Sequence, residues 1–130
     1  GLDDVENPHV MENLFTTLGA TSIDFPHKTE CCGSYQTVDN SSIVAERTNK
    51  ILTSARKQGA DVVALSCPLC AFNLDNRQKQ TAEIYSEFKK IPILYFSQLL
   101  AIALGCSEDA LRLDLHYVDP KPVLKQKGLL

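Results

Sequence analysis

The sequence has no excess of basic residues, no long apolar run and no internal repeat. Its 13 lysine and arginine residues are outnumbered by 16 acidic ones, so the formal net charge is −3. A nonspecific nucleic-acid binder needs a basic surface to displace counterions from phosphates, so this kind of partner is excluded. The longest strongly apolar run, residues 91–105, contains Pro92, Ser97 and Gln98 and is too short and too polar to insert into a bilayer. The 130 residues, 44% of them apolar, predict one compact domain.

The five cysteines do not form the pattern of a secreted disulfide scaffold. Their number is odd, and no signal-peptide pattern opens the chain. Four of them form two tight pairs, Cys31 with Cys32 and Cys67 with Cys70, while Cys106 stands alone. This usage is typical of a reducing compartment, so we expect a cytoplasmic protein whose paired thiols form a metal or redox site.

Strand-like and helix-like segments alternate along the chain. The run at residues 61–66 is continuously apolar, as in a strand buried on both faces of a parallel sheet. The alternation predicts an α/β fold, a small open parallel sheet flanked by helices. Asn7 and Ser97 are expected to cap the helices that follow them. We expect strands at residues 22–25, 61–66 and 93–96, helices at residues 8–18, 42–58, 68–80, 98–104 and from 107, and an extended tail from 119.

Both cysteine pairs follow expected strands, at the sheet edge where parallel sheets gather ligands. Pro68 suits the first position of a helix, which makes Cys67 its N-cap and Cys70 its third residue. Free amides and the positive end of the helix dipole favour thiolates there. Gly33 permits an unusual backbone angle and the close approach of a bulky ligand. The candidate catalytic, cofactor-binding and metal-ligating residues are therefore Cys31, Cys32, Cys67 and Cys70, with Gly33 as a further cofactor-binding residue.

Three chemistries are compatible with this set of thiols. The first is an iron–sulfur cluster held by cysteine thiolates, and the second is a zinc ion with four thiolate ligands. The third is a metal-free dithiol in which Cys67 and Cys70 act as a CxxC pair. The adjacent Cys31 and Cys32 are awkward ligands for one tetrahedral ion, whereas each can bind a different iron of a cluster.

Several other residues have possible roles near these thiols. His27 would complete a zinc site, and Lys28 and Arg77 would place positive charge near a cluster or an anionic substrate. Cys106 is expected to be a small, half-buried residue outside the site. Three side chains on the helix after Cys70 are expected to form an exposed face or to contact a partner subunit: Asp75, Arg77 and Gln78.

The sequence resembles a known family at the cysteine pairs. Residues 30–33 read ECCG, residues 66–70 read SCPLC, and residues 73–75 read NLD. Together they are similar to the cysteine-rich CCG domain, and most of all to the C-terminal CCG domain found in the B subunit of the CoB–CoM heterodisulfide reductase family. Segments 6–8, 91–96 and 98–100 are similar as well, so the resemblance covers nearly the whole chain.

This resemblance implies that residues 1–130 form a single CCG domain, the C-terminal half of a two-domain subunit. It implies a non-cubane [4Fe-4S] cluster held by Cys31, Cys32, Cys67 and Cys70. The activity implied is that of an oxidoreductase subunit that cleaves a small-molecule disulfide of the CoM-S-S-CoB kind. Electrons would come from a ferredoxin-like iron–sulfur subunit of the same complex.

One feature departs from the family pattern. The motif of the family opens with a further cysteine upstream of the CCG pair, and this chain has none before Cys31. The chain starts at Gly1, its only methionine is Met11, and few strands are expected. We therefore expect a truncated CCG domain that lacks its first strand and first ligand, is inactive in isolation, and holds zinc, a partial cluster or nothing.

Overall fold

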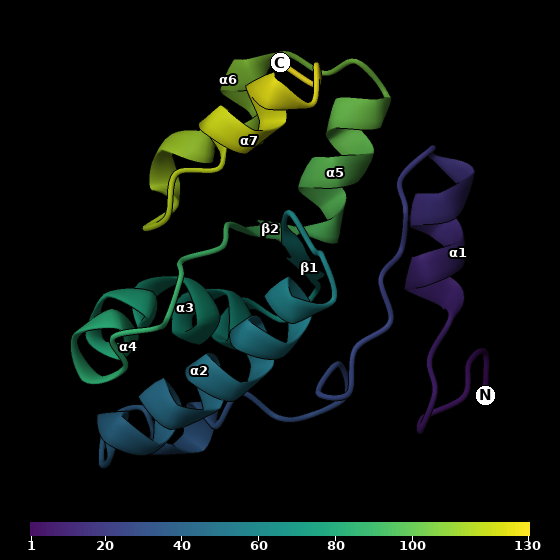
Figure 1. Cartoon of the computed structure of the whole chain (residues 1–130). Helices are drawn as coiled ribbons and strands as arrows, with labels where there is room; N and C mark the ends of the chain where they lie inside the picture. The colour runs from purple at the N-terminus through teal and green to yellow at the C-terminus, as the bar shows by residue number, and fades with distance from the viewer.

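Two short parallel strands form the centre of the molecule. The computed structural model describes Gly1–Leu130, and in it β1 (Val63–Leu65) pairs with β2 (Ile93–Tyr95) so that Val63 lies opposite Ile93. The helices are α1 (Val10–Thr17), α2 (Ser41–Lys57), α3 (Pro68–Asn76), α4 (Gln78–Ile84), α5 (Phe96–Ala103), α6 (Glu108–Leu111) and α7 (Lys121–Gln126), with 3-10 turns η1 (Ser34–Gln36) and η2 (Leu113–Leu115). The expected α/β fold, a small open parallel sheet flanked by helices, is confirmed (Figure 1).

Each face of the sheet packs against its own apolar core. Val63, Leu65 and Ile93 pack into a cluster with α2 and α3. Leu94, which is fully buried, points to the other side, where it packs with leucines of α6, η2 and α7. Successive side chains of a strand point to opposite faces, so two three-residue strands are sufficient to join both cores. Figure 1 shows α2, α3 and α4 on one side of the sheet and α5, α6 and α7 on the other.

The strongest periodic segment folds as expected. The predicted helix 42–58 is α2, and its expected apolar face, Val44, Ile51, Leu52 and Ala55, is buried. The predicted helix 68–80 is instead two helices, because α3 ends at Asn76 and α4 then continues to Ile84. Nothing in the apolar pattern marks that break, since residues of both helices are buried on the α2 side.

Residues 22–25 do not form the strand that their alternation predicts. Ile23 and Phe25 are half-buried while Ser22 and Asp24 are exposed, so the alternation does reflect burial on one side. The only backbone hydrogen bond of this segment is a turn, in which Lys28 N donates to Phe25 O at 3.2 Å. A strand requires a paired neighbour for its backbone groups, and here none is present, so the prediction of a third strand is wrong.

The extended tail predicted from residue 119 is also wrong. Residues 121–126 form α7, with Pro122 in its first turn, where its missing N–H has no helical partner to lose. Leu124 of this helix is buried in the second core beside Leu94. The prolines alone favour an extended tail, but the burial of Leu124 in the second core stabilises the helix instead.

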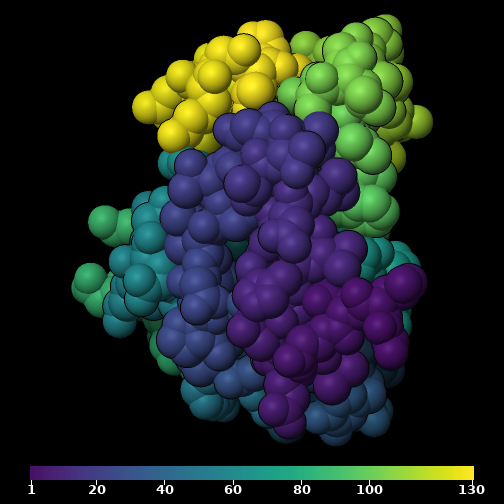
Figure 2. Space-filling view, turned by 90° about the vertical axis from the view of Figure 1, so that its right-hand side faces the viewer, coloured from purple at the N-terminus to yellow at the C-terminus, as the bar shows by residue number.

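The N-terminal segment lies over one face of the molecule, and polar contacts within the segment hold the start of α1. Helix α1 has no buried residue, and Figure 2 shows residues of this segment, purple to blue, spread across that face. Asn7 does not cap α1 as expected. The carboxylate of Asp3 instead accepts hydrogen bonds from His9 N at 2.9 Å and Val10 N at 2.9 Å. The expected caps of α5 also differ, because Tyr95 rather than Ser97 is the N-cap.

The hold of Asp3 on α1 is expected to weaken in acid. Backbone hydrogen bonds from His9 and Val10 keep the pKa of Asp3 below its ordinary 3.8. The folded pKa is lower than the unfolded one, so these bonds stabilise α1 fully above pH 3.8 and are lost as the pH falls through the lowered value. The amide shifts of His9 and Val10, followed by NMR between about pH 6 and pH 2, should titrate together. In Asp3→Asn the acidic titration should be missing; its persistence there would contradict the assignment.

None of the seven helices is both long enough and apolar enough to cross a membrane.

Candidate functional site

The start of α3 carries two of the candidate thiols directly after β1. Cys67 is the N-cap with extended backbone angles, φ −84° and ψ 123°, and Pro68 follows at the first helical position, as the sequence predicts. The pKa of the Cys67 thiol is lowered, chiefly because the backbone N–H groups of Cys70 and Leu69 at the start of α3 lie close to its sulfur. Cys67 is also exposed, so the thiolate favoured at this helix end is open to solvent.

Cys70 lies one turn further into the helix and has the opposite electrostatic character. Burial, together with the neighbouring Cys32 and Cys67 thiols, raises the pKa of Cys70 to about 12. Cys70 packs against the apolar core that contains Cys32, so it lies beside Cys32, which is far away in the sequence, as well as beside Cys67. Cys70 therefore has one predicted ligand from each cysteine pair, Cys32 and Cys67, as a neighbour.

The two adjacent cysteines differ in exposure, because Cys31 faces solvent and Cys32 is buried in the core. Cys32 is only 1% exposed and belongs to the first apolar core, whereas Cys31 is exposed and its sulfur accepts a hydrogen bond from Gly33 N at 3.4 Å. Gly33 has φ +79°, the left-handed region that favours glycine. A Cβ there would meet only ordinary contacts, the nearest being Arg47 Cγ at 3.7 Å, so the backbone angle rather than crowding requires glycine.

Asn73, which the sequence pattern did not mark as a site residue, has the one side chain other than a cysteine that hydrogen-bonds to a thiol. Its amide is 1% exposed, and Nδ2 donates to the Cys32 sulfur at 3.6 Å. Its Oδ1 accepts from Thr37 Oγ1 at 2.8 Å, and Thr37 in turn accepts from Arg77. The available signal was its position three residues after Cys70, which places both residues on one helix face.

Other residues expected near the thiols have different partners. His27 Nδ1 lies 2.6 Å from Glu30 Oε1, and Lys28 Nζ pairs with carboxylates of Glu12 and Asp24 at 2.8 and 3.0 Å. Neither contacts a cysteine sulfur, so the roles considered for them have no support in the structure. Cys106, expected to be half-buried, is exposed.

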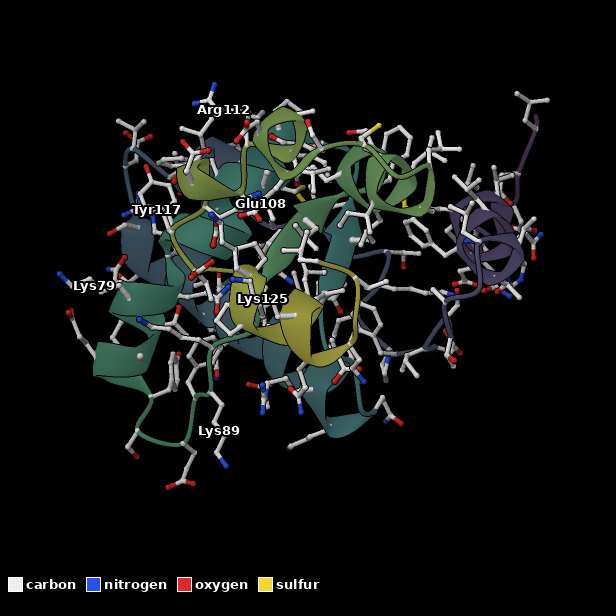
Figure 3. All side chains as sticks on the ribbon, turned by 90° about the horizontal axis from the view of Figure 1, so that it is seen from above. Lys79, Lys89, Glu108, Arg112, Tyr117 and Lys125 are labelled. Carbon is white, nitrogen blue, oxygen red and sulfur yellow. The ribbon has the colours of Figure 1, made fainter.

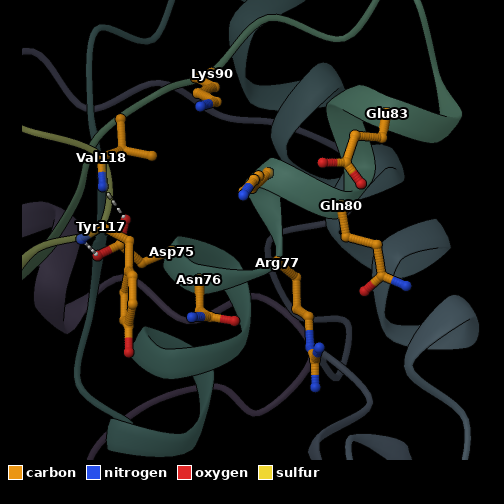
Figure 4. Close-up of a pocket in the computed structure, with 9 residues that line it drawn as sticks. Asp75, Asn76, Arg77, Gln80, Glu83, Lys90, Tyr117 and Val118 are labelled. Carbon is orange, nitrogen blue, oxygen red and sulfur yellow. Dashed lines mark hydrogen bonds between the residues drawn. The ribbon is translucent and has the colours of Figure 1, made fainter.

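The expected exposed face of Asp75 and Gln78 is wrong, because both side chains are buried. The Asp75 carboxylate accepts from Tyr117 N and Val118 N, each at 2.9 Å (Figure 4). Gln78 donates to Leu74 O and Ile91 O at 2.9 and 2.8 Å and accepts from Ile91 N at 2.9 Å. Both residues hold α3 and α4 to the segments around them and are not available to a partner subunit.

A shallow hollow of about 470 Å³ lies beside Asp75 but contains no cysteine. It is drawn in Figure 4, and Lys79, Lys90 and Glu83 are among its charged residues. In Figure 3 the long side chains of Lys79, Lys89 and Arg112 point away from the body of the molecule. The hollow is therefore separate from the thiol site and has a mixed, solvated lining.

The thiol site fits a thiolate-bound group by its donor chemistry. Its candidate ligands are cysteines alone, two of them at a helix N-terminus, where thiolate is favoured. No three His, Cys, Asp or Glu side chains surround a common point as they would around a metal ion. Cys31 points to solvent and would have to turn inward to join the other three.

The two cysteines of α3 should differ strongly in reactivity in the metal-free, reduced protein. Near pH 8 the thiolate fraction of Cys67 is raised by its amide contacts, whereas the pKa of Cys70, about 12, keeps that thiol protonated. Alkylation by iodoacetamide, followed by peptide mass spectrometry, should modify Cys67 at least about 100-fold faster. Equal rates at the two positions would contradict the electrostatic difference.

Comparison with known proteins identifies the family. The family model of the cysteine-rich domain named CCG matches residues 3–75. The chain is 31% identical over 119 residues to the 8-methylmenaquinol:fumarate reductase membrane anchor subunit of Wolinella succinogenes, covering 92% of this chain and 42% of that protein.

Two proteins of Methanosarcina species are similar to about the same extent. The chain is 33% identical to the B subunit of the ferredoxin:CoB-CoM heterodisulfide reductase of Methanosarcina mazei, over 90% of this chain and 40% of that protein. It is 34% identical, with the same coverage, to the B subunit of the ferredoxin/F(420)H(2)-dependent CoB-CoM heterodisulfide reductase of Methanosarcina acetivorans. The chain spans about two fifths of the length of these relatives. The match of the family model over residues 3–75, which contain both cysteine pairs, places the chain in the CCG family of cysteine-rich domains.

Proposed function

We propose that this chain is a redox module that holds an iron–sulfur cluster through Cys31, Cys32, Cys67 and Cys70. The observation that carries the proposal is the position of Cys70, which packs against the core that contains Cys32 and lies beside Cys67 where β1 leads into α3. The cluster type we propose is a non-cubane [4Fe-4S] cluster, because adjacent cysteines bind two irons more easily than one. Bound there, the cluster would supply single electrons and iron sites for substrate sulfur.

The residues of the chain have distinct parts in this proposal. The amides at the start of α3 favour the thiolate of Cys67, which is the form that binds iron. Cys32 is shielded in the core, so its sulfur is kept from water and oxidants. Gly33, in the left-handed conformation, lets the chain turn between Cys32 and η1 and leaves Cys31 free to approach from solvent.

In the larger protein we propose the reductive cleavage of a small-molecule disulfide, such as CoM-S-S-CoB. Two electrons and two protons convert one disulfide into two thiols, and the electrons would come from a ferredoxin-like iron–sulfur subunit. The relatives support this reaction class, because two of them are named as heterodisulfide reductase subunits. We propose that the chain forms one half of a two-domain cytoplasmic subunit, since it spans about two fifths of their length.

The direct test is metal analysis of the protein after anaerobic reconstitution with ferrous iron and sulfide. Iron and acid-labile sulfide are expected in a ratio near one, with roughly four of each per chain for a complete cluster and fewer for a partial one. About one zinc per chain after purification, with no capacity to take up iron and sulfide, would contradict the cluster and favour a structural zinc module.

A metal-free dithiol oxidoreductase is the second candidate, and the lowered pKa of Cys67 favours it. In that reaction the Cys67 thiolate would attack a substrate disulfide, and Cys70 would resolve the mixed disulfide. The high pKa of Cys70, about 12, opposes the second step. Disulfide reduction by the metal-free protein with dithiothreitol as reductant would support this candidate. If no such reduction is found, the iron–sulfur proposal is favoured.

A further inference from the structure

A chain of hydrogen bonds leads from the Cys32 sulfur through the side chains of Asn73 and Thr37 to Arg77. Arg77 donates through one terminal nitrogen to Thr37 O at 2.9 Å and to Thr37 Oγ1 at 3.1 Å. Thr37 Oγ1 donates to Asn73 Oδ1 at 2.8 Å, and Asn73 Nδ2 donates to Cys32 Sγ at 3.6 Å. We call Arg77, Thr37 and Asn73 the thiol relay. It joins the loop that carries Cys32 to the helix that carries Cys67 and Cys70.

The direction of the thiol relay follows from the chemistry of its first member. A guanidinium has only donors and stays protonated, so the Thr37 hydroxyl oxygen must accept from Arg77. The single hydroxyl proton of Thr37 is then free to bond Asn73, which must present its carbonyl oxygen to receive it. The amide of Asn73 is thereby turned so that its NH₂ group faces the Cys32 sulfur.

The burial of Cys32 makes this donor important. Both Cys32 and Asn73 are about 1% exposed, so water has little access to the sulfur. A buried sulfur that carries negative charge needs a donor from the protein, and Asn73 is the only side chain that donates an N–H to any cysteine here. Hydrogen bonds to ligand sulfurs withdraw electron density and help set the reduction potential of iron–sulfur sites.

We propose that Asn73 is a positioning residue whose NH₂ group, oriented by Thr37 and Arg77, stabilises electron density on the Cys32 sulfur and raises the reduction potential of the group bound there. The effect on the reduction potential rests on the proposed function, because it requires a bound cluster. The orientation of the Asn73 amide does not depend on a cluster. Arg77 thus acts on the site through two other residues, without contact to a thiol.

The test compares four variants of the full chain. Thr37→Val removes the middle of the relay, Arg77→Met removes its far end without changing Thr37 or Asn73, and Thr37→Ser retains the hydroxyl. Thr53→Val is the matched control, because Thr53 Oγ1 also donates to an asparagine, Asn49, at 3.1 Å, and that pair bonds no cysteine. Thermal unfolding of each variant establishes that it is folded.

The first measurement is NMR of the Asn73 side-chain NH₂ in the metal-free, reduced chain. Thr37→Val and Arg77→Met are expected to speed its hydrogen exchange about ten-fold or more, because the amide is no longer held. Thr37→Ser and Thr53→Val should leave it slow. An unchanged exchange rate in both relay variants would overturn the proposal, whatever the chain does with iron.

The second measurement is the midpoint potential of the reconstituted iron–sulfur chain. The midpoint potentials of Thr37→Val and Arg77→Met are expected to be more negative than that of the wild type. Thr37→Ser, which keeps the hydroxyl, should have the wild-type potential. Equal potentials in wild type, Thr37→Val and Arg77→Met would overturn the effect on the sulfur. A chain that takes up no iron and sulfide would instead contradict the proposed function, while the exchange rates still decide the orientation of Asn73.

Discussion

Replacing Cys32 with serine is expected to reduce iron and sulfide uptake about ten-fold or more. Cys32 is buried in the first core and is the thiol from the first pair that lies beside Cys70. A serine hydroxyl does not ionise near neutral pH and is a poor ligand for iron in a sulfur-rich site. No spare sulfur replaces it, since Cys70 is itself a proposed ligand and Cys31 faces solvent. Iron and acid-labile sulfide assays after anaerobic reconstitution measure the loss.

The matched control is Cys106→Ser. Cys106 is exposed and lies outside both pairs, so this variant should load like the wild type. If Cys32→Ser and Cys106→Ser load equally, the thiol site is not where the cluster binds. Circular dichroism of both variants separates a lost ligand from a lost fold, because the serine also places a hydroxyl in the core. Cys31→Ser tests independently whether the exposed thiol turns inward to join the site.

Replacing Asp75 with alanine is expected to lower the free energy of unfolding by about 3 kcal/mol, the sum of two hydrogen bonds to a charged group. Asp75 is 5% exposed, and its carboxylate accepts from the backbone amides of Tyr117 and Val118. His116 Nδ1 lies 3.5 Å from the same carboxylate. These contacts fasten the segment between η2 and α7 to α3, and with it the second core. Urea unfolding followed by circular dichroism gives the free energy.

Asp114→Ala is the control for that measurement. Asp114 also pairs with a neighbouring cation, Arg112 at 3.2 Å, but both side chains are about 60% exposed. Exposed ion pairs contribute little, so the free energy of unfolding of Asp114→Ala should be close to that of the wild type. Similar losses for Asp75→Ala and Asp114→Ala would show that the two amide bonds of Asp75 do not stabilise the native state. Tyr117→Ala would leave those bonds intact, because they come from the backbone.

Local chemistry explains the parts of the fold that the sequence predicts well. Helix α2 has a regular apolar face and no helix breaker, and all four residues of that face are buried. The cap at Cys67 follows from Pro68, whose fixed φ suits only the first turn of a helix. The strands β1 and β2 are continuous apolar runs bounded by polar residues and prolines. In each case the residues that decide the structure are within a few positions of one another.

The failures concern interactions between distant residues. Residues 22–25 alternate like a strand but have no backbone partner, and a partner cannot be inferred from alternation alone. Asp75 and Gln78 look like solvent-facing polar residues on a helix, yet the backbone groups that they bond, apart from Leu74 O, lie 13 to 43 residues away in the sequence. Burial of a polar side chain is favourable only when such partners exist, and the local sequence does not show them.

The sequence by itself determined the α/β class, the main helix and the presence of four cysteines in two pairs at the ends of expected strands. Only the tertiary structure decided that Cys32 turns inward to lie beside Cys70 while Cys31 faces solvent. It also decided that Asn73 faces the Cys32 sulfur. The physical reason is that periodicity and capping act within a few residues, whereas the direction of a side chain in a loop depends on packing and hydrogen bonds with elements far along the chain.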